Sequence, residues 1–149
     1  MRKWQVFVSV FSFIVVVGEA KAGDEEEVMA KLNSWYTVLA AGDIDALEMS
    51  PHTRFNLNGG LLSDANFKGQ IKAWLATSGV KINIQGHHGD VKVYGDAAEY
   101  TGYESVNITS PKGEERQETN RVTVVWAKQK DDWRAVHVHV SSLTPVNPE

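Results

Sequence analysis

Residues 118–143 read ETNRVTVVWAKQKDDWRAVHVHVSSL, and this stretch decides the fold. Two runs of alternating sequence, rich in β-branched and aromatic residues, flank the polar segment from Lys128 to Asp132. Alternation with a period of two is typical of a half-buried strand, and a polar break between two such runs indicates a turn. The stretch therefore predicts a β-hairpin whose second strand carries His137 and His139 on one face.

The register of this hairpin can be predicted by requiring that polar side chains share one face and apolar side chains share the other. If the turn closes Ala127 against Trp133, then Arg121 lies opposite His139. A slip of one residue would mix polar and apolar side chains on both faces, so the unmixed register is favoured. One face is then polar and carries Arg121, Thr123, His137, His139 and Ser141. The other is dry and carries Val122, Val124, Trp126, Val136, Val138 and Val140. The pattern does not decide which face looks inward.

The rest of the chain places helices before strands. Apolar residues at helical spacing predict helices over 24–41 and 64–77, with a short helix from Asp43 that ends before Ser50-Pro51. Residues 52–58 are expected to be extended, with a break at Gly59-Gly60. Strands are expected over 80–94, 96–109, 115–128 and 132–143, separated by turn sequences. Helices followed by antiparallel strands indicate an α+β fold.

Several segments carry a family resemblance. The hairpin has two tryptophans seven residues apart, followed by VHVHVS at 136–141. This resembles the association (hub) domain of calcium/calmodulin-dependent protein kinase II and the SnoaL-like proteins of the nuclear transport factor 2-like superfamily. LAAGDIDAL at 39–47 and VKVYGDAA at 91–98 are similar to other parts of that superfamily. The resemblance implies a cystatin-like cone, in which three N-terminal helices pack on a strongly bent antiparallel sheet. It also implies an apolar pocket at the open end and dimerisation through the sheet.

The N-terminal segment predicts export. Arg2 and Lys3 precede an apolar run over 6–17, and Ala20-Lys21-Ala22 places small residues where a signal peptidase cleaves. We therefore expect a signal peptide at 1–22, a single SnoaL-like domain at 23–149, and a periplasmic or secreted location. The apolar run is too short for a spanning helix, which needs about 20 residues. The sequence contains no cysteine, so no disulfide can form.

The charge of the chain narrows the classes of partner. Loss of 1–22 removes three cations and one anion, which takes the formal charge from −4 to −6. An acidic domain is a poor partner for nucleic acid or for an anionic membrane surface. We therefore expect a small-molecule ligand and a second copy of the chain as partners, with no nucleic acid and no membrane after removal of the signal.

Apolar and polar residues supply candidates for a ligand pocket. The apolar set comprises Trp35, Tyr36, Phe55, Leu57, Phe67 and Trp74. Binding pockets are mostly apolar with a few directed polar groups, which His52, Arg121, His137 and His139 could provide. Two readings of Arg121 and the paired histidines stay open. They line the pocket, or they lie on the outer face of the sheet and contribute to a dimer interface.

An enzyme of the isomerase, dehydratase or cyclase kind is the alternative to simple binding. The resemblance to ketosteroid isomerase-like members implies a tyrosine on the first helix and an aspartate base in the next extended segment. Trp35 and either Asn56 or Asn58 hold those places here, and an amide cannot abstract a proton. A histidine acid–base mechanism remains, but no catalytic residue can be named.

Metal binding and scaffolding are two further alternatives. The paired histidines would need a third zinc ligand from His52, His88 or Glu118, and we expect neither a metal nor a cofactor. In the kinase association domain, the resemblance implies arginines at the places held here by Val124 and Val140. Arg54 or Arg121 would have to replace them for anion binding, so the resemblance supports oligomerisation more than that binding mode.

Overall fold

The structure is a computed structural model and describes residues 23–47, 49–57 and 59–143. Two α-helices are present, α1 (Asp24–Ala41) and α2 (Asp64–Ser78), with a 3₁₀ turn η1 (Ile44–Ala46) between them. Six strands form one sheet. They are β1 (Thr53–Phe55), β2 (Leu61–Ser63), β3 (Lys81–Tyr94), β4 (Ala97–Thr109), β5 (Glu115–Gln129) and β6 (Asp132–Ser142). The predicted α+β class is confirmed, and the boundaries of the four long strands agree with the prediction to within about two residues, whereas β2 was not predicted. The predicted signal peptide lies outside the described residues.

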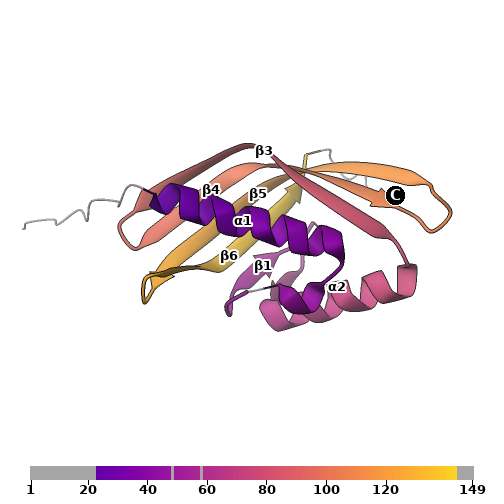
Figure 1. Cartoon of the computed structure of the whole chain (residues 1–149), viewed down its shortest axis with the longest axis horizontal. Coiled ribbons are helices and arrows are strands. Elements are labelled where there is room, and N and C mark those ends of the chain that lie inside the picture. Colours follow the sequence, from indigo (N-terminus) through magenta and orange to yellow (C-terminus); the bar gives the residue numbers. More distant parts are fainter. Residues whose placement is uncertain (1–22, 48, 58, 144–149) are drawn as a thin grey trace, which may run out of the picture.

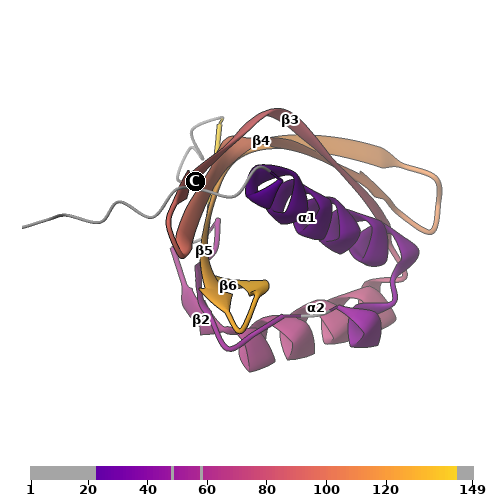
Figure 2. The same ribbon diagram turned by 60° about the vertical axis from the view of Figure 1, so that its left-hand side comes forward.

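The sheet bends around α1 to form the predicted cone. Its strand order is β2-β1-β6-β5-β4-β3. The long strands β3, β4 and β5 curve over α1, and α2 lies across the opposite side of the opening (Figures 1 and 2). One detail of the prediction is wrong, because β1 pairs parallel with β6 and the sheet is therefore mixed.

A second correction concerns the helices. The short helix expected from Asp43 is only the three-residue turn η1, in which the Asp43 carboxylate accepts a hydrogen bond from the Ala46 amide at 3.3 Å. The turn ends at Leu47, whose φ of −69° and ψ of 104° are extended rather than helical. Two α-helices and a turn therefore replace the three expected helices.

Helix α1 is held by burial on one side and by an ion pair at its start. Val28, Leu32 and Leu39 are buried against the sheet, as their spacing predicts. Lys128 donates to the Asp24 carboxylate at 2.7 Å, which ties the first turn of α1 to β5. The helix ends at Gly42, whose φ of 72° lies in the left-handed region that glycine adopts freely.

The β5–β6 hairpin has the predicted faces but not the predicted register. Its turn is only Lys130 and Asp131, with φ of 52° and 64°, which are the positive values that a tight two-residue hairpin turn requires. Arg121 pairs with Ser141, and Thr123 pairs with His139. The register is thus displaced by two residues from the prediction at this end, and a displacement of two leaves the faces unchanged.

The tight turn accounts for one residue of this displacement, and a β-bulge in β6 accounts for the other. The pairing changes step between Val125/His137 and Trp126/Ala135, so Val136 is the extra residue. Val136 was predicted on the dry face, but Ala135 and Trp133 take that face and are buried. The bulge therefore lets Trp133 face the core at one end of β6 and Val138 at the other.

Candidate functional site

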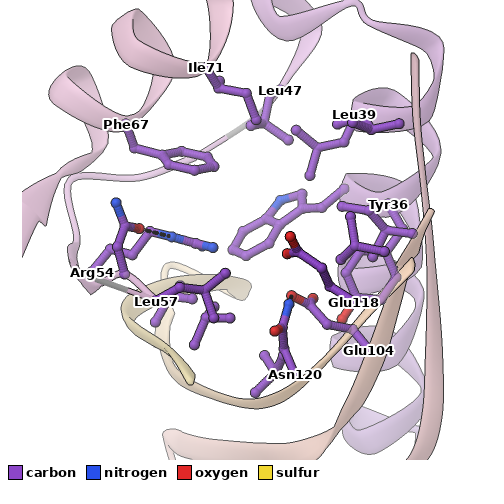
Figure 3. Close-up of a pocket in the computed structure, with 18 of the residues that line it drawn as sticks. Tyr36, Leu39, Leu47, Arg54, Leu57, Phe67, Ile71, Glu104, Glu118 and Asn120 are labelled. Atoms are coloured by element: carbon purple, nitrogen blue, oxygen red, sulfur yellow. Dashed lines mark hydrogen bonds between the residues drawn. The ribbon is translucent and has the colours of Figure 1, made fainter. Parts of the chain in front are cut away.

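The dry face of the hairpin looks into the cone and lines a cavity of about 580 Å³. Helices α1 and α2 and strands β1, β3, β4, β5 and β6 all contribute to its wall. Most of the lining is aliphatic or aromatic, including Leu39, Leu47, Phe67, Ile71, Val122 and Val138 (Figure 3). Leu57, Trp74 and Arg116 also line it and keep large exposed fractions, so they mark where the cavity opens to solvent.

The polar side chains of the wall come from opposite sides. Arg54 enters from β1, and Figure 3 shows it pointing toward the middle of the cavity between Phe67 and Leu57. Glu104, Glu118 and Asn120 enter from β4 and β5 on the other side. Strand alternation explains this placement, because Arg54 occupies the register position of Val138, a buried residue of the inward face.

Arg54 is held in place by two contacts that carry no opposite charge. Its Nε donates to Asn56 Oδ1 at 3.0 Å, and its guanidinium carbon lies 4.4 Å from the centre of the Phe67 ring. Burial lowers the pKa of Arg54, although attraction from Glu104 opposes this shift. Among the described residues no carboxylate lies within 4.0 Å of this guanidinium. The other cation of the wall, Arg116, is paired with Glu118 at 2.8 Å.

Glu104 is the buried acid of the cavity. Only 7% of its surface is exposed, and its Oε1 accepts a hydrogen bond from Asn120 Nδ2 at 3.2 Å. Burial raises the pKa of Glu104, since removal from water disfavours the charged form, while Asn120, Arg54 and Tyr36 oppose the shift. A carboxyl in this setting can hold a proton at higher pH than an exposed glutamate.

The Tyr36 side chain extends from α1 and places its hydroxyl near Glu104. Its pKa is raised well above the ordinary range, first by burial and then by Glu104 and Tyr100. The hydroxyl is buried and makes no hydrogen bond of good geometry within the described residues, although Glu104 and Tyr100 lie near enough to perturb it. The Tyr36 phenol therefore lies beside Glu104 and Tyr100, and its proton can be directed to either of them or to a ligand.

Glycines in β3 and β4 make room for the two tyrosine rings. A Cβ added to Gly102 would lie 2.8 Å from Tyr100 Cζ, and one added to Gly89 would lie 2.6 Å from Tyr100 Cε2. A Cβ at Gly86 would meet Tyr36 Cε2 at 3.3 Å. Tyr100 can lie flat against the sheet because these positions lack side chains. The glycines therefore allow the side chains of Tyr36 and Tyr100 to lie close to β3 and β4.

The structure separates the predicted site residues into two groups. Trp35, Tyr36, Leu57, Phe67 and Trp74 line the cavity as expected. Phe55, Arg121, His137 and His139 do not line it. His52 is buried, with Nδ1 2.9 Å from the Ser50 carbonyl oxygen, and does not contribute to the cavity wall either.

The outer face of the sheet carries four of the residues that do not line the cavity: Phe55, Arg121, His137 and His139. Phe55 packs edge-on against both histidines, with ring centres 5.7 Å from His137 and 5.9 Å from His139. The Thr53 hydroxyl and His137 Nδ1 are 2.8 Å apart. Arg121 is exposed and donates to the Ser142 carbonyl at 2.9 Å. Of the two readings that the sequence left open, the outer-face position is the one the structure shows.

Metal-site geometry is absent from this outer face and from the other described residues. No group of three or more His, Asp or Glu side chains in 23–47, 49–57 and 59–143 could hold an ion. The third ligands considered for the histidines lie elsewhere, because Glu118 faces the cavity and His88 lies at the β3 bulge beside Tyr103. Within the same residues no helix is long and apolar enough to cross a membrane.

The sequence model described as SnoaL-like domain matches residues 28–145. The chain belongs to this family. The match spans both helices and all six strands, and the predicted superfamily is confirmed. Because this family has the nuclear transport factor 2-like fold, the cavity belongs to a ligand-binding or enzyme-type domain.

Solved structures confirm the cystatin-like fold. A nuclear transport factor 2-like protein with a cystatin-like fold from Novosphingobium aromaticivorans is 17% identical, with a TM-score of 0.68 over 81% of this chain and 82% of its own. A candidate dehydratase of the same family from Streptomyces avermitilis is 17% identical, with a TM-score of 0.72 over 80% and 96%. A candidate calcium/calmodulin-dependent protein kinase II association domain from Xanthomonas campestris is 21% identical, with a TM-score of 0.68 over 87% and 96%. No curated protein matches the sequence.

Three polar side chains of the cavity wall were not predicted as ligand-binding residues: Glu104, Glu118 and Asn120. Glu118 was considered only as a metal ligand, and Glu104 and Asn120 were not considered at all. A signal for two of them was present, because alternation carried back from Trp126 through Val122 places Asn120 and Glu118 on the dry face. Arg54 was considered only as an alternative to Arg121 for anion binding, and its position in the wall depends on the parallel pairing of β1 with β6, a long-range contact that leaves no local pattern.

Proposed function

We propose that this is an exported protein that binds a small, partly apolar molecule inside the cone. The observation that carries the proposal is the cavity of about 580 Å³ with a mostly apolar wall. Pockets of roughly 300–1,000 Å³ with a few directed polar groups are typical of small-ligand sites. The N-terminal sequence is the support for export, and it rests on residues 1–22.

A matched pair of substitutions on α2 tests this binding. Ile71 lines the cavity, whereas Ala73 on the same helix is exposed and outside the wall. We expect Ile71→Trp to fill the cavity and abolish binding of the neutral fluorescent probe N-phenyl-1-naphthylamine. Ala73→Trp should bind the probe as the wild type does. Circular dichroism shows that both variants are folded, and equal probe binding by both would contradict the cavity as the site.

Native mass spectrometry of the mature protein purified from its host tests the natural ligand and the subunit number together. Purification must avoid a metal-chelating column. We expect a homodimer that carries a reproducible extra mass. The support for self-association is the likeness to the Xanthomonas campestris association domain. A bare oligomer larger than a dimer would instead favour the scaffold alternative.

Catalysis is the second candidate function, and Glu104 is the observation that favours it. The histidine mechanism has no support in the cavity, because His137 and His139 face outward. Glu104 has a raised pKa and lies beside the Tyr36 hydroxyl, an arrangement suited to general acid–base chemistry. If the protein is an enzyme, Glu104→Gln should remove turnover of the substrate while the cavity still binds it.

A further inference from the structure

Arg54 is a cation of the cavity wall that makes no direct ion pair within the described residues, although Glu104 attracts it from a longer distance. Arg54 is wedged between Phe67 and Leu57, and no carboxylate of the described residues lies within 4.0 Å of it (Figure 3). Its contacts, the Asn56 amide oxygen and the Phe67 ring, are weaker partners for a guanidinium than a carboxylate is. A largely buried guanidinium without a direct ion pair is costly, and an anionic group of a ligand at Arg54 would reduce that cost.

The contact with Asn56 also fixes how the guanidinium is presented. Asn56 Oδ1 occupies the Nε hydrogen at 3.0 Å, which leaves the two terminal nitrogens without a hydrogen-bond partner among the described residues. These two nitrogens form a planar fork that matches the two oxygens of a carboxylate. The orientation of Arg54 is therefore set before any ligand enters.

Two further donors face Arg54 from the other side of the cavity (Figure 3). The Tyr36 hydroxyl is buried without a hydrogen bond of good geometry, and Arg54 and Glu104 are both near enough to perturb its pKa. Glu104 uses Oε1 to accept from Asn120, so its second oxygen can carry a proton and donate. The nearest other acid of the wall, Glu118, is already paired with Arg116. The polar groups of the wall therefore include several donors and, in Arg54, a cation without a direct ion pair among the described residues.

We infer that the ligand of this cavity is a carboxylic acid with an apolar body, whose carboxylate is held by Arg54 and the Tyr36 hydroxyl. This inference rests on the proposed function and names its ligand class. A single guanidinium balances one negative charge, which favours a monocarboxylate over a phosphate dianion. The apolar body fills the space between α2 and the inward valines of β5 and β6.

Three small molecules that share one apolar body test the class. 1-Naphthaleneacetate, 1-naphthaleneacetamide and 2-(1-naphthyl)ethylamine carry an anionic, a neutral and a cationic head. Each is titrated against N-phenyl-1-naphthylamine bound to the wild-type protein. We expect the carboxylate to displace the probe at a concentration about tenfold or more below the amide, because hydrogen bonds to charged groups are the stronger ones. The amine should be the weakest of the three.

Arg54→Gln separates the head group from the cavity. This variant should still bind N-phenyl-1-naphthylamine, but its affinities for the carboxylate and the amide should agree within about twofold. The matched control Arg134→Gln removes an arginine of β6 that pairs with Asp132 outside the large cavity, and it should keep the preference. Glu104→Gln should also keep it, since the amide still donates and removes any competing negative charge.

Two results would overturn the inference in distinguishable ways. If the wild type binds the probe but treats carboxylate and amide alike, or prefers the amine, the cavity binds ligands and the carboxylate class is wrong. If neither the probe nor any naphthalene derivative binds, the proposed function fails with it. Persistence of the preference in Arg54→Gln would show that another group recognises the carboxylate.

Discussion

The two faces of the curved sheet differ in how polar groups are arranged. On the convex face, Thr123, His137 and His139 lie together at the surface, and solvent satisfies whatever their neighbours do not. On the concave face a few polar side chains interrupt an apolar wall, and Arg54 and Glu104 have few partners. The difference shows that a dense polar cluster can be ordinary surface, whereas an isolated polar group in a dry wall is the better indicator of a site.

Substitutions of two neighbouring residues of β5, one on each face, should give the largest difference in the free energy of unfolding. Trp126 faces inward, is 1% exposed and stacks on Trp35 with ring centres 5.0 Å apart, whereas Val125 faces outward and is half-buried. Trp126→Ala should lower the free energy of unfolding by about 3–5 kcal/mol, because it leaves a large cavity in the core. Val125→Ala should cost less than about 1 kcal/mol. Chemical denaturation measures both, and equal losses would contradict the assignment of faces.

The close packing of the Tyr100 ring over Gly102 and Gly89 should give the next largest effect on stability. Gly102→Ala places a Cβ 2.8 Å from Tyr100 Cζ and 3.1 Å from Gly89 Cα, so overpacking should cost about 1–3 kcal/mol. Tyr100→Phe should recover part of this loss in the double variant, because it removes the hydroxyl. The control is Gly69→Ala on α2, where nothing lies within 4 Å and the stability should rise by about 0.5–1 kcal/mol. Thermal denaturation of the four variants tests this, and full additivity of Gly102→Ala with Tyr100→Phe would rule out the contact.

Glu104 should make the stability of the fold fall as pH rises. Its pKa is raised in the folded state, first by burial, so the folded protein holds this proton at pH values where the unfolded chain has lost it. The contribution is full below the unfolded pKa of about 4.3 and is lost as pH rises through the folded pKa. Asn120, Arg54 and Tyr36 oppose this rise of the pKa, and Glu118 lines the same cavity.

Glu104→Gln should therefore flatten the dependence of the free energy of unfolding on pH. At pH 8 the variant should be more stable than the wild type, and the difference should shrink as the pH falls toward the unfolded pKa. Glu99→Gln changes the same kind of group on the outer face of the same strand and should keep the wild-type slope. A parallel pH profile for Glu104→Gln and wild type would show that the buried carboxyl ionises without cost.

The smallest effect is expected on the convex face. His139 is exposed and packs against Phe55 outside the cavity. His139→Ala should change the free energy of unfolding by about 0.5 kcal/mol or less. The affinity for N-phenyl-1-naphthylamine should not change. A loss of probe binding with an intact fold would mean that the outer face takes part in the site after all.

The fold could be predicted because its signals are local. Apolar spacing at Val28, Leu32 and Leu39 gave the first helix, and alternation along 118–143 gave the hairpin and its two faces. The register could not be predicted, because the positive φ angles of Lys130 and Asp131 and the bulge at Val136 have no distinctive residues. Neither glycine nor asparagine marks that turn.

The site was harder to predict than the fold. His137 and His139 drew attention because two imidazoles on one strand are conspicuous, yet alternation says only that they share a face. The direction of that face depends on how the sheet curves around α1, which is a property of the whole domain (Figure 2). Arg54 was named from the sequence only as one of two possible anion-binding arginines, and its place in the cavity wall depends on the pairing of β1 with β6 across more than eighty residues.

The bulge at Val136 has a consequence for how this sequence can change length. Ala135 faces inward, His137 outward and Val138 inward, so loss of Val136 would leave an unbroken alternation along β6. Loss of His137 instead would also allow regular pairing, but with Val136 at the outer position. An insertion or deletion of one residue in a strand normally turns half of it inside out. At this position a single-residue deletion is expected to be tolerated, with a change in strand twist and no exchange of the two faces.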